Sequence, residues 1–204
     1  MKQYSIFLAG VGGQGILTAG SIISTAALIE GKNVLLSEIH GMSQRLGSVY
    51  MTVRIGEVTS PLIPKGEADM MIALELIEAT RYAHMLKSEG WLILNENLIP
   101  PPGAMIGSEK VPSETEIIKS LETNFKRIIK VNALKIAEEL GSYLLQNTIL
   151  LGIAFAVPEF PLRPQSGEEA IKRVFAKKQK IIELNIRAFR TGLEFGKKLI
   201  QKIC

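Results

Sequence analysis

The sequence contains little from which a metal centre could be built. Its 204 residues include a single cysteine, Cys204 at the last position, and two histidines, His40 and His84. Iron–sulfur clusters and structural zinc sites are each held by several cysteine or histidine ligands. The chain therefore cannot hold a cysteine-ligated cluster or an internal disulfide by itself, and we predict no metal site within it.

Long apolar runs are also missing. The first run, at residues 6–9, is too short for the hydrophobic region of a signal peptide, and the run at 148–157 is about half the length of a membrane span. We therefore predict a cytoplasmic protein that does not associate with membranes. With 47% hydrophobic and 22% charged residues, the chain can bury a sizeable core, and we expect residues 1–204 to form a single domain.

Charge of one sign does not dominate the sequence either. The net charge is +4, which does not argue for a nucleic-acid partner. The basic residues concentrate in the segment 172–202. Such a basic helical face is usually solvated surface, and an acidic partner or ligand is the alternative.

Patterns of buried strands alternate with helical patterns along the whole chain. Strands are predicted at 4–9, 34–38, 48–55, 68–74, 90–95 and 127–131, and helices at 16–29, 75–86, from 113, and at 133–140, 147–157, 167–177 and 178–203. This alternation indicates an α/β fold: an open, mostly parallel twisted sheet, Rossmann-like, with helices on both faces and C-terminal helices. We expect the first two strands to be parallel neighbours, because a helix connects them in a βαβ unit.

The first strand is followed by a glycine-rich loop. Gly10, Gly12 and Gly15 have the G-x-G-x-x-G spacing between a strand and a helix. Glycines allow a positive φ and close backbone approach, and the free N–H groups of a helix N-terminus favour phosphate or another anion. Glu38 lies where a dinucleotide-binding fold places its ribose-binding acid, but the side chain of Gln14 would project into the place of the pyrophosphate. A further alternative is that the glycines only allow the helix to pack tightly on the strand.

A polar segment, residues 37–49, follows the second strand. The glycine loop and this segment both lie at the carboxyl end of the sheet, so we expect them to converge in space. Arg45 is suited to binding a carboxylate or phosphate, or to pairing with Glu38, and Ser43 and Gln44 are suited to orienting a polar group. His40 is more typical of a structural residue than of an acid–base catalyst, and we assign no catalytic residue.

Together these two motifs resemble the gamma-type domain of the 2-oxoacid:ferredoxin oxidoreductases. The resemblance rests on residues 10–15, 38–45 and 47–49, and residues 60–64, 66–69, Leu74, Glu75, Glu78 and Arg81 also fit it. It covers the whole chain, and within the family the indolepyruvate-oxidising members look most similar. Leu46 stands where many relatives have a glycine, which would reshape the loop.

The resemblance implies an activity shared between subunits. Such enzymes oxidatively decarboxylate a 2-oxoacid, here indolepyruvate and other arylpyruvates, form an acyl-coenzyme A and reduce ferredoxin. It implies that thiamine diphosphate, Mg²⁺ and [4Fe–4S] clusters belong to a larger alpha subunit. This chain would bind none of them tightly and would be inactive outside a hetero-oligomer such as α2β2. Coenzyme A would be a substrate that this chain contacts. The cofactor-binding residues that we predict are Gly10, Gly12, Gly13, Gln14, Gly15, Ser43, Gln44 and Arg45.

Two other function classes fit parts of the pattern. One is a stand-alone NAD(P)- or flavin-binding Rossmann-type oxidoreductase, and the other is a non-catalytic scaffold. Co-purification with a larger, cysteine-rich chain would distinguish a subunit from both. The apolar stretch 148–160 and the loop around Met42 are candidates for the partner surface, and ordinary core is the alternative for the first.

Overall fold

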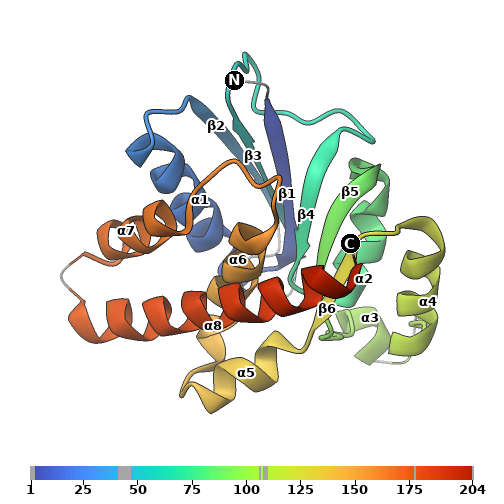
Figure 1. Cartoon of the computed structure of the whole chain (residues 1–204). Helices are drawn as coiled ribbons and strands as arrows, with labels where there is room; N and C mark the ends of the chain where they lie inside the picture. The colour runs from blue at the N-terminus through green and yellow to red at the C-terminus, as the bar shows by residue number, and fades with distance from the viewer. Residues whose placement is uncertain (1–2, 41–46, 106, 108–109, 177, 204) are drawn as a thin grey trace.

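A six-stranded sheet forms the centre of the protein in the computed structural model, which describes residues 3–40, 47–105, 107, 110–176 and 178–203 (Figure 1). Its strands lie in the order β2-β3-β1-β4-β5-β6. β1, β4, β5 and β6 are parallel, whereas β3 is antiparallel to both β1 and β2. The prediction of an open, mostly parallel α/β sheet is confirmed. The strands are β1 (Tyr4–Val11), β2 (Val34–His40), β3 (Ser48–Ile55), β4 (Ala68–Ala73), β5 (Leu86–Asn95) and β6 (Ile128–Val131).

The prediction that the first two strands are neighbours is wrong. β3 lies between them, pairing Ser48 with Val11 of β1 and Val49 with His40 of β2. A parallel return of the chain needs a crossover of about a dozen residues or more. Since the link from β2 to β3 is shorter than that, β3 runs back antiparallel beside β2 and fills the place next to β1.

Helices cover both faces of the sheet. Alternate side chains of β1 point to opposite faces, so that Ile6 and Leu8 join one core cluster and Phe7 and Ala9 join the other. The first cluster is covered by α1 (Ile16–Ile29), α5 (Ala133–Glu139), α6 (Gln146–Ala156), α7 (Pro164–Val174) and α8 (Gln179–Ile203). The second is covered by α2 (Leu76–Tyr82) and α4 (Glu114–Asn124). Three short elements complete the fold: η1 (Ala83–Met85), α3 (Pro102–Met105) and η2 (Tyr143–Leu145).

The apolar stretch 148–160 belongs to the core and not to a partner surface. Ile149, Leu150 and Ile153 of α6 are fully buried. α8 crosses α6 (Figure 1) so closely that a Cβ on Gly152 would lie 2.1 Å from the Phe189 carbonyl oxygen. The second candidate for the partner surface, the loop around Met42, lies outside the described residues.

Some helices and strands begin where the sequence predicted, and others begin earlier. α4 begins with the predicted capping box at Ser113, and the Asn132 side chain caps α5. β5 begins four residues before the predicted residue 90, because Leu86 already pairs with Ala68. α7 begins at Pro164, before the predicted residue 167, because proline is favoured in the first turn of a helix. Within the described part of the chain, no helix is long and apolar enough to cross a membrane.

Candidate functional site at the carboxyl edge of the sheet

The glycine loop, residues 12–15, joins β1 to α1 at the carboxyl edge. Gly13 and Gly15 have φ angles of 98° and 81°, in the left-handed region. The side-chain amide of Asn147 donates to the Gly15 carbonyl (3.0 Å), and a Cβ on Gly15 would lie 2.5 Å from that nitrogen. A Cβ on Gly13 would meet open space. Gly15 therefore allows tight packing against α6, whereas Gly13 serves the turn and leaves space beside it.

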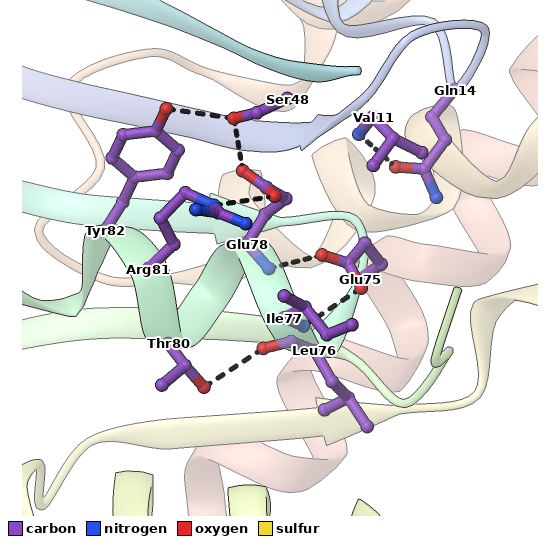
Figure 2. Close-up of polar contacts among 10 residues, drawn as sticks. All are labelled: Val11, Gln14, Ser48, Glu75, Leu76, Ile77, Glu78, Thr80, Arg81 and Tyr82. Atoms are coloured by element: carbon purple, nitrogen blue, oxygen red, sulfur yellow. Dashed lines mark hydrogen bonds and ion pairs between the residues drawn. The ribbon is translucent and has the colours of Figure 1, made fainter. Parts of the chain in front are cut away.

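Gln14 corrects an expectation from the sequence. Its side chain does not project into the open loop. The Oε1 atom accepts from the Val11 N–H (2.9 Å, Figure 2), and the Nε2 atom donates to the Leu74 carbonyl (3.1 Å). The Asn95 side chain donates to the same carbonyl (3.0 Å). Gln14 thus ties the loop to the end of β4, and its side-chain amide is engaged with the backbone of its own chain.

Two pockets flank the loop on the α1 side of the sheet. One, of about 540 Å³, lies between the loop, η2, α6 and α8. The other, of about 390 Å³, lies between the start of α1 and the end of β2, where Glu38 and His40 line it. The Gly12 N–H also donates to the Gly47 carbonyl (2.9 Å). The predicted convergence of the two motifs is confirmed for these residues. Ser43, Gln44, Arg45 and Leu46 lie outside the described residues.

A second polar cluster lies on the α2 side of the same edge, and our sequence reasoning did not assemble it (Figure 2). The Ser48 hydroxyl donates to the Glu78 carboxylate and lies 2.9 Å from the Tyr82 hydroxyl. The Arg81 Nε donates to the other oxygen of Glu78 (2.9 Å). The spacing of Glu75, Glu78 and Arg81 is a signal for one helix face, but Ser48 is thirty residues from Glu78 in the sequence.

Glu75 is the N-cap residue immediately before α2, and it is fully buried. Its carboxylate accepts from the Ile77 N–H (2.9 Å) and the Glu78 N–H, so it caps the helix (Figure 2). Burial raises the pKa of Glu75 to about 7, and the nearby Glu78 carboxylate also raises it, against the lowering effect of the backbone donors. Glu75 therefore titrates near neutral pH.

Among the described residues, no group of three or more histidine, cysteine or acidic side chains is arranged to hold a metal ion. The carboxyl edge instead offers glycine backbone and the start of α1, which no side chain caps because its N-cap residue is Gly15. Such a surface is suited to a phosphate-bearing or other anionic ligand.

Comparisons with known proteins agree over nearly the whole chain. The family model described as pyruvate ferredoxin/flavodoxin oxidoreductase matches residues 5–195. The chain is 46% identical over 190 residues to the indolepyruvate oxidoreductase subunit IorB of Archaeoglobus fulgidus, covering 93% of this chain and 94% of the relative. It is 39% identical to the protein of the same name from Thermococcus kodakarensis, covering 98% and 99%.

A solved structure agrees with the fold. The gamma subunit of a keto/oxoacid ferredoxin oxidoreductase from Geobacter sulfurreducens superposes with a TM-score of 0.71 at 25% identity. The match covers 95% of this chain and 98% of that one. The length, the fold and the sequence likeness therefore point to the same group of proteins.

Proposed function

Because this chain belongs to the pyruvate ferredoxin/flavodoxin oxidoreductase family, we propose that it is the small subunit of an indolepyruvate oxidoreductase. In this proposal the assembled enzyme decarboxylates indolepyruvate and other arylpyruvates, transfers the aryl-acetyl group to coenzyme A and passes two electrons to ferredoxin. The observation that carries the proposal is the likeness, at 46% identity and nearly full length, to a relative named for that activity.

The proposal divides the chemistry between two subunits. Thiamine diphosphate, which supplies the carbanion chemistry when bound, belongs with its Mg²⁺ and the [4Fe–4S] clusters to a larger alpha subunit. This chain has one cysteine, too few to hold a cluster by itself. It therefore acts only within a cytoplasmic hetero-oligomer such as α2β2, where ferredoxin accepts the electrons.

The contribution of this chain is to bind coenzyme A over the thiamine site of its partner. The start of α1 favours a phosphate, and the open space beside Gly13 allows a ligand to approach the backbone. In this proposal Gln14 acts indirectly, by holding the loop in shape. The residues proposed to face the cofactors are Gly10, Gly12, Gly13, Gly15, Ser43, Gln44 and Arg45.

Co-expression with the large subunit tests the proposal. The purified complex should reduce ferredoxin with indolepyruvate or phenylpyruvate only when coenzyme A is present, and should use pyruvate and branched-chain 2-oxoacids less well. Each chain alone should be inactive. The proposal fails if no complex forms, if pyruvate is the best substrate, or if the isolated small chain binds NAD(P) or purifies with a flavin.

A further inference from the structure

Arg81 is a cation held in place at one of its three nitrogens. Its Nε donates to Glu78, while half of its side chain (52%) is exposed to solvent. No other hydrogen bond or ion pair joins it to the residues that the structure describes. The two terminal amino groups are therefore free to bind an anion, and a guanidinium fork matches the oxygens of a phosphate.

The partner of Arg81 is fixed in turn. The Glu78 carboxylate is buried, and it is held by the Ser48 hydroxyl, which itself contacts the Tyr82 hydroxyl. Burying a carboxylate costs several kcal/mol unless it is paired and hydrogen-bonded. Because of this cost, the buried Glu78 carboxylate adds little to the stability of the fold. It does orient the Arg81 guanidinium (Figure 2).

This fixed cation is linked to the glycine loop by a series of contacts. Ser48 follows Gly47, whose carbonyl accepts from Gly12. A short series of contacts, from Gly12 through Gly47, Ser48 and Glu78, thus links the loop to Arg81. The glycine loop and Arg81 therefore belong to the same edge of the sheet, with Arg81 on its α2 side.

A third pocket, of about 310 Å³, lies beside Arg81 between α2 and the start of α4. It holds a second cation, Lys110, which is exposed and has no ion-pair partner within the described part of the chain. No acidic side chain is among its described lining residues. The remaining walls are mostly apolar: Ile77, Thr80, Pro101, Val111, Pro112 and Ile117. Two cations beside apolar walls suit a phosphate attached to a flat ring, as in a nucleotide.

We propose that Arg81 and Lys110 bind the 3′-phosphate of coenzyme A, with the adenine against the apolar walls and Glu78 as a positioning residue. A phosphomonoester carries nearly two negative charges at neutral pH, which two cations match. The proposal rests on the proposed function, in which coenzyme A is a substrate. It adds a site for the nucleotide end that the sequence motifs did not include.

Dephospho-coenzyme A, which keeps the reactive thiol but lacks the 3′-phosphate, is the test substrate. In the wild-type complex, the KM for dephospho-coenzyme A should be about tenfold or more above that for coenzyme A. Arg81→Ala should reduce this ratio to about 1–2, and Lys110→Ala should reduce it about threefold, because a lysine binds phosphate as a point charge. Both should leave the KM for the 2-oxoacid unchanged.

Two matched controls separate binding from general damage. Arg187→Ala removes an exposed arginine of α8 that lines none of the three pockets, and it should leave the ratio unchanged. Glu78→Gln should lower the ratio by raising the KM for coenzyme A, because it releases the Arg81 side chain, whereas Glu75→Gln, at the buried carboxylate that caps α2, should not change the ratio.

The outcomes distinguish this site from the proposed function. If the wild-type complex shows no coenzyme A-dependent oxidation of 2-oxoacids, the proposed function fails. If it is active but the Arg81 and Lys110 variants keep the wild-type ratio, or raise both KM values equally, only the nucleotide site is wrong. Should Arg81→Ala fail to assemble, Lys110→Ala decides, because substituting an exposed lysine that has no ion pair among the described residues changes stability little.

Discussion

Two carboxylates at opposite edges of the sheet have pKa values shifted in opposite directions. At the amino edge, Glu30 ends α1 and accepts from the Arg163 N–H (2.7 Å), the Ser166 hydroxyl (2.6 Å) and Lys32 (2.8 Å). Burial alone would raise its pKa, but these donors lower the pKa to about 2. At the carboxyl edge, the donors to Glu75 among the described residues are backbone N–H groups, a second carboxylate lies nearby, and the pKa of Glu75 is raised to about 7.

The two edges of the sheet differ in how their buried carboxylates affect the stability of the fold. At the amino edge, a charge with enough donors joins α1 to α7 and stabilises the fold. At the carboxyl edge, the fold tolerates a carboxylate that is costly to ionise, directly beside the Glu78–Arg81 pair. Buried polar groups that do not favour stability are common at functional sites. We therefore expect neutralising Glu30 and neutralising Glu75 to change the free energy of unfolding in opposite directions.

The largest effect is expected at the amino edge. Glu30→Gln should lower the free energy of unfolding at pH 7 by about 2–3 kcal/mol, because a carboxylate with a folded pKa near 2 and an unfolded pKa near 4.5 stabilises the fold above pH 4.5. That contribution is lost as the pH falls from 4.5 to 2. Urea denaturation at pH 7 and at pH 2.5 measures the free energy of unfolding of the wild type and the variant. If Glu30→Gln lowered it equally at both pH values, the lowered pKa of Glu30 would be contradicted.

The next prediction compares two glycines of the loop at the carboxyl edge, Gly15 and Gly13. Gly15→Ala should lower the free energy of unfolding by about 2 kcal/mol, because a left-handed alanine is strained and its Cβ displaces the Asn147 amide. Gly13→Ala meets open space and should cost about 1 kcal/mol, from strain alone. Urea midpoints of the two variants give the difference. Equal losses would mean that the contact with Asn147 does not matter.

At Glu75 the expected change in stability has the opposite sign. Its folded pKa near 7 exceeds the ordinary value of 4.5, so the folded state holds an extra proton between these values and stability falls as the pH rises through them. Glu75→Gln removes this penalty. It should raise the free energy of unfolding by about 1–2 kcal/mol at pH 8 and leave it unchanged at pH 4. A variant less stable at pH 8 than the wild type would show that the charged cap is needed.

Local signals predicted much of the fold from the sequence. The alternation of strands and helices, the glycine loop and the caps at Ser113 and Asn132 depend on residues close together in the chain, whose conformational preferences persist after folding. The order of the strands does not depend on such signals. Our prediction paired β1 with β2, but the short link after β2 and the pairing of β3 with β1 decided otherwise.

Two features follow from the residues alone: the glycine-rich turn after the first strand, and a cysteine count too low for an iron–sulfur cluster held by this chain alone. The positions of the charged and polar side chains around that turn depend on the folded chain. Gln14 turned inward to Leu74, and Ser48 met Glu78 across thirty intervening positions. Spacing along the chain carries no information about such contacts, because β3 and α2 come together only when the sheet has formed.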